Sequence, residues 1–147
     1  MASFLDYEHG ISVIDAHYQR PGLAALYLLI EGGQAAFIDT GTSHSVPDAL
    51  DVLRQKGLVP ESVAYVIPTH AHLDHAGGAG AMMRCFPNAR LVAHPRAVRH
   101  LIDPTKLIAG VTEVYGAEAV ARRFGEVVPV PAGRVIEAPD GFTLSLG

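Results

Sequence analysis

The sequence predicts an α/β protein (α+β layered), and three observations support that prediction. Short apolar runs of strand length alternate with segments whose apolar residues recur at helical spacing. Glycines and prolines that form turns separate these runs, and no repeat or linker divides the chain. The length of 147 residues matches the usual size of one domain. We therefore expect one domain over residues 1–147, built on a layered sheet core.

Three apolar strands open the chain. The first is Ile11 to Ile14, and the run AALYLLI from Ala24 to Ile30 is the second. A Gly-Gly turn then leads into AAFI at Ala35 to Ile38, so these last two runs predict a hairpin buried on both faces. The hairpin ends in Asp39, which begins a polar segment at the carboxyl end of a buried strand.

A helix and a fourth strand follow. Residues Ser45 to Lys56 carry their apolar side chains on one helical face, Ser45 with Asp48 resembles a capping box, and Gly57 suits the C-terminal stop. The run VAYVI from Val63 to Ile67 predicts the next buried strand.

The second half predicts four helices and one clear strand, followed by short strands between Val127 and Gly147 that prolines interrupt. In chain order these are a helix through Met82, Met83 and Phe86, a strand at Leu91-Val92-Ala93, a helix from Pro95 to about Ile102, a helix capped by Asp103-Pro104 that contains Leu107, Ile108, Val111 and Val114, and a helix from Ala117 to Phe124.

Composition excludes several classes of function. Hydrophobic residues make up 49% of the chain and charged residues 18%, which opposes disorder. The net charge of −4, with no basic run, argues against a nucleic-acid or membrane partner, and no apolar stretch reaches the ~20 residues of a membrane helix. No signal peptide is visible, and Cys85 is alone, so we expect a cytoplasmic protein that acts on a small-molecule substrate.

The segment THAHLDHAGG, residues 69–78, carries the functional prediction. It follows a buried strand, so its first residues should be extended, and His70 and His72 can then converge on one atom. On a helix the same two side chains would diverge by about 200°. Asp74 and His75 add a carboxylate and an imidazole. This ligand set suits zinc, iron or manganese, and the absence of thiolates argues against a structural zinc knuckle.

The alternative is a set of unrelated histidines. Three histidines within six residues, around an aspartate and after a buried strand, argue against it. Outside this segment, His94 is expected to lie in a surface turn, while His44 is of interest only because it follows Asp39 closely. Arg122-Arg123 predicts a solvated helix face.

THAHLDHAGG resembles the His-x-His-x-Asp-His signature of the metallo-β-lactamase superfamily, and FIDTG at 37–41 resembles its earlier Asp-containing motif. The order of hairpin, Asp39, helix, strand and histidine motif is also similar, from about Ser12 onward. The apolar hairpin and the helices after His94-Pro95 are most similar to the glyoxalase II-like hydrolases. The resemblance implies the N-terminal half of a metallo-β-lactamase-type αββα sandwich.

The same resemblance implies roles for individual residues. His70 and His72 would bind one metal ion, and Asp74 and His75 a second. The implied cofactor is zinc, one or two ions, with iron and manganese as alternatives. Asp39 would orient a ligand or its loop, and its alternative role is that of a turn residue after a strand. Asp74 is also the implied catalytic residue, because it would help to orient the hydroxide that attacks an ester, thioester or lactone.

Two other functions stay open. A mononuclear iron oxygenase similar to persulfide dioxygenases would bind Fe(II) through two histidines and a carboxylate. An inactive half-domain would bind metal weakly. The remaining ligands of the superfamily lie in a C-terminal half, so we expect an incomplete domain at Gly147. For the 147 residues alone we expect weak metal binding, negligible hydrolysis and self-association through exposed strands, which leaves a homo-oligomer open.

Overall fold

Seven strands form one sheet, and their order in the sheet is their order along the chain. This computed structural model describes residues 1–147. The first four strands pair antiparallel, and β4 to β7 pair parallel. The strands are β1 (Phe4–Asp6), β2 (Ile11–Asp15), β3 (Ala25–Glu31), β4 (Gln34–Ile38), β5 (Val63–Ile67), β6 (Arg90–Ala93) and β7 (Val135–Glu137).

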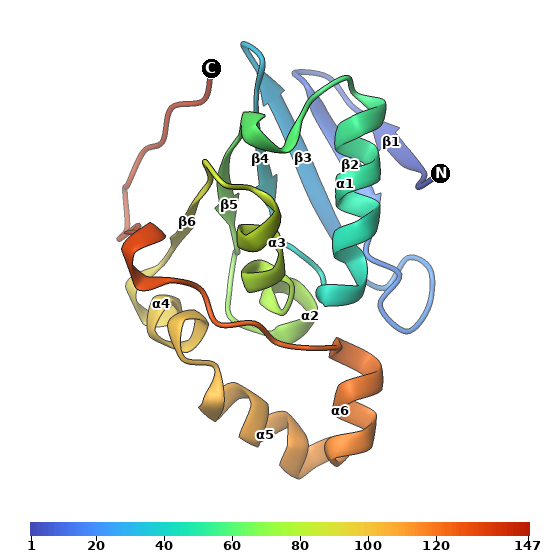
Figure 1. Ribbon diagram of the computed structural model, residues 1–147, viewed down its shortest axis with the longest axis vertical. Helices are drawn as coiled ribbons and strands as arrows, with labels where there is room; N and C mark the ends of the chain where they lie inside the picture. The colour runs from blue at the N-terminus through green and yellow to red at the C-terminus, as the bar shows by residue number, and fades with distance from the viewer.

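Helices connect the parallel strands. Figure 1 shows α1 and α3 in front of the sheet, with α5 and α6 as a pair below it. No helix is long and apolar enough to cross a bilayer. The helices are α1 (Val46–Gln55), α2 (Leu73–Ala76), α3 (Ala79–Cys85), α4 (Pro95–Ile102), α5 (Thr105–Tyr115) and α6 (Ala117–Phe124), and 3-10 turns lie at Ser43–Ser45, Pro60–Ser62 and Ala132–Arg134.

The main core lies between the sheet and the helices in front of it. Leu28 of β3 and Phe37 of β4 are fully buried there, as is Met82 of α3. Phe37 stacks on Phe86, with ring centroids 5.4 Å apart. Full burial of such side chains contributes roughly 1.5–3 kcal/mol each, so this layer holds the strands and helices in place.

A second, smaller cluster joins the α5–α6 pair to the rest of the domain. It consists of Leu73 on α2 with Val120 and Phe124 on α6. Because Leu73 lies between His72 and Asp74, this cluster anchors the histidine segment directly to the helical pair.

The predicted layered α/β fold is confirmed, with corrections in detail. The prediction of a hairpin buried on both faces is correct for β4 and wrong for β3. Ala35, Ala36 and Phe37 are all buried, but Tyr27 is 39% exposed. Leu26 and Leu28, the neighbours of Tyr27 in β3, are fully buried in the main core, so Tyr27 lies on the opposite face of the strand, which is less covered.

The predicted capping box at Ser45 and Asp48 is wrong. Ser45 Oγ donates a hydrogen bond to the carbonyl of Ala16 at 2.9 Å and makes no cap. The helix begins at Val46. Its predicted stop is correct, because Gly57 has a φ of +78° and its N–H donates to the carbonyl of Arg54 at 2.9 Å.

The predicted short strands between Val127 and Gly147 are reduced to one, β7. The side chain of Arg134 precedes it and donates to the carbonyls of Met83 at 2.7 Å and of Ala89 at 2.7 Å, as well as to that of Phe86. This guanidinium, rather than further strand pairing, ties the end of the chain to α3 and β6.

Candidate metal centre

The parallel pairing of β4 and β5 brings two polar segments together. Ile38 lies opposite Ile67 in the register, so the residues that follow both strands emerge at the same edge of the sheet. The N–H of Asp39 donates to the carbonyl of Ile67 at 3.0 Å, and the N–H of Thr40 donates to that of His75 at 2.8 Å. The backbone alone therefore places Asp39 beside the histidine segment.

Asp39 is the buried centre of this arrangement. Its Oδ1 accepts hydrogen bonds from Thr69 N at 2.7 Å and Thr69 Oγ1 at 2.9 Å, and its Oδ2 lies 3.0 Å from His75 Nδ1. Its backbone has a φ of +59°, a left-handed conformation that aspartate tolerates better than most residues. The carboxylate thus fixes both ends of the segment from Thr69 to His75.

The imidazole rings gather at one place on the surface. The ring centroid of His70 lies 4.9 Å from that of His72 and 4.4 Å from that of His75. The carboxylate of Asp74 lies 3.4 Å from His75 Nε2. The structure therefore brings together the four residues predicted as metal ligands, and Asp39 lies directly behind them.

A single helical turn shapes this segment, and the sequence did not predict it. His72 has an extended backbone, as expected, but α2 begins at Leu73 and carries Asp74 and His75. The N–H groups of His75 and Ala76 donate to the carbonyl of His72 at 3.0 and 2.8 Å. The turn brings the last two predicted ligands back towards His70.

Gly78 closes the site from behind. Its N–H donates to the carbonyl of Gly41 at 3.0 Å and to Thr40 Oγ1 at 3.1 Å. A Cβ at this position would lie 2.7 Å from the carbonyl oxygen of Thr42, so only glycine allows this approach. Gly78 thus holds the loop after β4 against the histidine segment.

The donor set fits a divalent metal ion. Thr69 Oγ1 lies 2.9 Å from Nδ1 of His70, and the carboxylate of Asp39 lies 3.0 Å from Nδ1 of His75. Nε2 of each ring therefore remains to bind a metal. Three imidazoles and a carboxylate are ligands of zinc, iron and manganese. No three His, Cys, Asp or Glu side chains are grouped tightly enough to form a ready metal shell, so the rings must turn to bind an ion.

Sequence analysis missed the residues that surround the centre. Tyr18 and Gln19, from the loop between β2 and β3, border a cavity that His72 and Asp74 also line. No local pattern marks Tyr18 or Gln19, because they lie in a loop and reach the centre only through the packing of α6. His94, predicted in a surface turn, caps α4 by accepting a hydrogen bond from Arg96 N at 3.2 Å and lies outside the centre.

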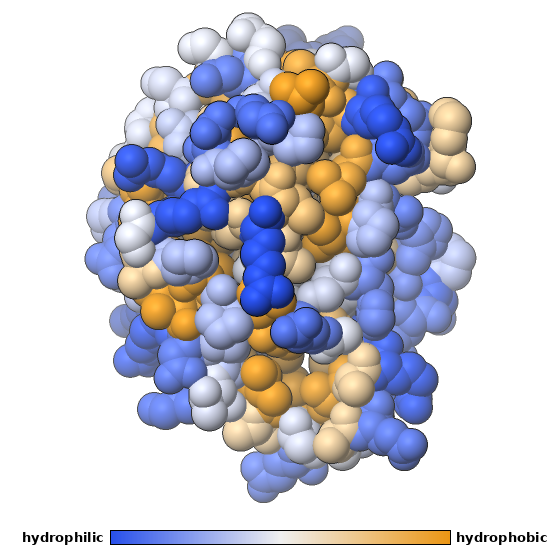
Figure 2. All heavy atoms as spheres, viewed as in Figure 1, coloured by the Kyte–Doolittle hydropathy of each residue, from blue (hydrophilic) through white to orange (hydrophobic).

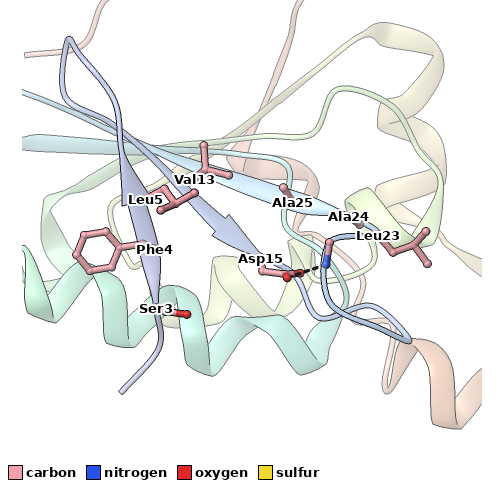
Figure 3. Close-up of a pocket in the computed structure, with 9 residues that line it drawn as sticks. Ser3, Phe4, Leu5, Val13, Asp15, Leu23, Ala24 and Ala25 are labelled. Carbon is pink, nitrogen blue, oxygen red and sulfur yellow. Dashed lines mark hydrogen bonds between the residues drawn. The ribbon is translucent and has the colours of Figure 1, made fainter.

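A separate apolar cavity of about 450 Å³ lies at the β1 edge of the sheet (Figure 3). Leu5, Val13 and Leu23 line it, and none of the predicted metal ligands does. Asp15 is its one charged residue. Burial opposes ionisation of Asp15, but hydrogen bonds from the N–H groups of His17 and Gly22 outweigh it and lower its pKa.

Comparison with known proteins places this geometry in a family. The profile of the Metallo-beta-lactamase superfamily matches residues 20–144. The hydroxyacylglutathione hydrolase of Anaeromyxobacter dehalogenans is 38% identical over 108 residues, which are 71% of this chain and 36% of that protein.

Solved structures show the same fold. A subclass B3 metallo-beta-lactamase isolated from a soil metagenome library superimposes with a TM-score of 0.71 at 20% identity, over 99% of this chain and 49% of that one. A metallo-beta-lactamase of Cronobacter sakazakii gives 0.69 at 21% identity, over 99% of this chain and 51% of that one. The chain spans about half the length of these lactamases and 36% of the hydrolase. Because the superfamily profile covers most of its residues, the chain belongs to the metallo-beta-lactamase superfamily.

Proposed function

We propose that this chain forms part of a metal-dependent hydrolase that cleaves an ester, thioester or lactone. The observation that carries the proposal is the grouping of His70, His72, Asp74 and His75 in front of the buried Asp39 carboxylate. The arrangement includes no Ser or Cys nucleophile, so the attacking group is water.

In this proposal His70 and His72 hold one ion, and Asp74 and His75 hold a second. A bound zinc ion lowers the pKa of its water towards neutrality and polarises the carbonyl oxygen of the substrate. Asp39 accepts the Nδ1 proton of His75, which presents Nε2 to the ion and fixes the ring. Asp74 lies beside that nitrogen, where its second oxygen can orient the attacking water.

The relatives support a thioester as the substrate. Besides the Anaeromyxobacter protein, a hydroxyacylglutathione hydrolase of Prochlorococcus marinus is 34% identical over 68 residues, 46% of this chain. The names of these proteins state that they cleave hydroxyacylglutathione, a thioester. We therefore take a glyoxalase II-like activity as the finer form of the proposal.

Metal analysis and turnover of a hydroxyacylglutathione thioester by the purified full-length enzyme, of which this chain forms part, test the proposal. We expect His72→Ala to lower metal content and turnover by at least tenfold, because a lost ligand cannot be replaced by the remaining side chains. His94→Ala is the matched control, since His94 is exposed and its ring accepts a hydrogen bond from Arg96 N at the start of α4. Equal losses in the two variants would refute the assignment. One bound iron with oxygen consumption would identify an oxygenase instead.

A further inference from the structure

An apolar cavity of about 340 Å³ opens directly beside the candidate metal centre. His72 and Asp74 line its inner side, and its outer wall includes Leu107 and Val111 of α5. Figure 2 shows hydrophobic side chains around a hollow between the α5–α6 pair and the rest of the molecule. The half-buried apolar face of α5 therefore borders this cavity in addition to packing on α6.

The floor of this cavity is rigid. Phe124 is 3% exposed and stacks on Tyr18, with ring centroids 5.6 Å apart and planes inclined by 18°. Leu73 lies in the same small core cluster. A wall made of packed aromatic and aliphatic side chains suits an apolar group of limited size.

Tyr18 and Gln19 also line a second cavity, of about 430 Å³, whose character is different. Four basic or ionisable nitrogen side chains line it and no carboxylate does: His17, His44, Arg122 and Arg123. Neither arginine forms an ion pair with an acidic side chain. His44 Nε2 lies 3.2 Å from the carbonyl of Arg122, so the two guanidinium groups are the donors that an anionic group could meet here.

One contact and one shared loop join the two cavities. The guanidinium of Arg123 lies over the ring of Tyr115, 4.2 Å from its centroid, and Tyr115 lines the apolar cavity while Arg123 lines the basic one. The loop that they share is built into the fold, because Asp15 accepts hydrogen bonds from His17 N and Gly22 N at 2.8 Å each. Arg123, predicted to be solvated, is thus held against an aromatic ring.

We propose that the two cavities are the substrate site of the hydrolase described above, on which this inference rests. The centre, the apolar cavity and the basic cavity follow one another in space. The substrate is then a small ester or thioester whose carbonyl lies at the centre, with an apolar spacer of a few methylene groups next to it and an anionic group at the far end. A carboxylate and a phosphate share the chemistry that the arginines recognise.

A series of chromogenic p-nitrophenyl esters tests this assignment on the purified, metal-loaded full-length enzyme, of which this chain forms part. The acyl chains contain two, four or six methylene groups and end in a carboxylate, a phosphonate or a methyl group. We expect kcat/KM to be about tenfold higher for an anionic end than for a methyl end at the best chain length, because charge-assisted hydrogen bonds discriminate by that order. Comparison of the carboxylate with the phosphonate identifies the anion.

Matched variants locate the effect. Arg122→Ala and Arg123→Ala should each reduce the preference for the anionic end about tenfold, whereas Arg99→Ala, at an exposed position on α4, should leave it unchanged. Val111→Phe should reduce kcat/KM for the longer chains by filling the apolar cavity, whereas Val114→Phe on the same helix, 74% exposed, should not. An equal kcat/KM for all three end groups would overturn the inference.

Binding without turnover separates this inference from the proposed function. Adipate, hexyl phosphate and hexanol are titrated into the protein, and the amide NMR shifts of Gln19 and Arg123 are followed. Saturable shifts with the two anions and none with hexanol support the site even if no ester is cleaved. If neither anion shifts these signals, the site is refuted even if esters are hydrolysed.

Discussion

His75 Nδ1 lies 3.0 Å from the carboxylate of Asp39, although the two residues are 36 positions apart in the chain. The contact joins the loop after β4 to α2, and the same carboxylate accepts two hydrogen bonds from Thr69. Asp39 is therefore a positioning residue, since it acts on the candidate ligands and on the loop that carries them.

Asp39→Ala should weaken zinc binding by about 10- to 100-fold, the usual effect of removing a partner that orients a ligand. It should also lower the free energy of unfolding by about 1–3 kcal/mol, because the hydrogen bonds that the buried Asp39 carboxylate accepts from Thr69 are lost. Calorimetric zinc titration and urea denaturation measure the two effects. Asp39→Asn keeps one acceptor oxygen and should lose less stability. Wild-type zinc affinity in Asp39→Ala would contradict the role.

The hydrogen bond to Asp39 also predicts the tautomer of His75. When neutral, this ring should carry its proton on Nδ1, because Oδ2 of Asp39 can only accept. Long-range proton–nitrogen NMR correlations distinguish the two tautomers. His100, which makes no side-chain hydrogen bond, should show a mixture and serves as the control. Finding His75 protonated mainly on Nε2 would contradict the contact.

Gly78→Ala should destabilise the protein by about 1–3 kcal/mol, because the added Cβ would lie 2.7 Å from the carbonyl oxygen of Thr42 and backbone must shift. Gly110→Ala is the matched control. Nothing lies within 4 Å of a Cβ there, and Gly110 is inside α5, so this change should stabilise by about 0.5–1 kcal/mol. Thermal unfolding measures the change in stability of both variants, and destabilisation by both would argue against a local clash at Gly78.

Lowering the pH should reduce the free energy of unfolding, because Asp51 becomes protonated and loses its stabilising interactions. A hydrogen bond from the N–H of Ala2 lowers the pKa of Asp51 against the opposing effect of burial, and Gln55 and Arg54 lower it further. The folded pKa lies below the unfolded one, so the stabilisation is present above pH 4 and disappears as the pH falls through the folded pKa.

Asp51→Asn should therefore be less stable than the wild type near pH 7, and the difference should shrink in acid. Glu113→Gln, at an exposed position on α5 with no hydrogen bond, should match the wild type throughout. Denaturation curves between pH 2 and pH 7 provide the comparison. A difference that stays constant with pH would exclude this cause.

Patterns local in the sequence predicted most of the sheet. The apolar runs of β2 to β6 are continuous, and the prolines and glycines that bound them mark their ends. β1 and β7 have three residues each, too few for any periodicity, so the sequence did not predict β1 and predicted β7 only as one of several short strands after Val127. Ser45 shows a further limit, because its hydroxyl binds Ala16, 29 positions away, rather than its own helix.

The candidate site also has parts that the sequence predicted and parts that it did not. The ligand types of His70, His72, Asp74 and His75 lie within six residues, so the sequence alone brings them together. The expected approach of Asp39 to this segment is confirmed, because two buried strands that both end in polar residues indicate it. The turn at α2 was not predicted, since no local pattern encodes it. The two cavities could not be predicted from the sequence, because they depend on contacts between distant residues. Tyr18 and Phe124 stack on each other although most of the chain separates them.

The strand order of the sheet has a consequence for how the protein folds. Each strand pairs with the strand made just before it, and only the pairing of β6 with β7 has to wait for α4, α5 and α6. During synthesis from the N-terminus, β4 can join β5 and place Asp39 against Thr69 and His75 before α5 and α6 have been translated. The scaffold of the candidate metal centre can therefore form first, and the walls that we propose to select the substrate are added to it afterwards.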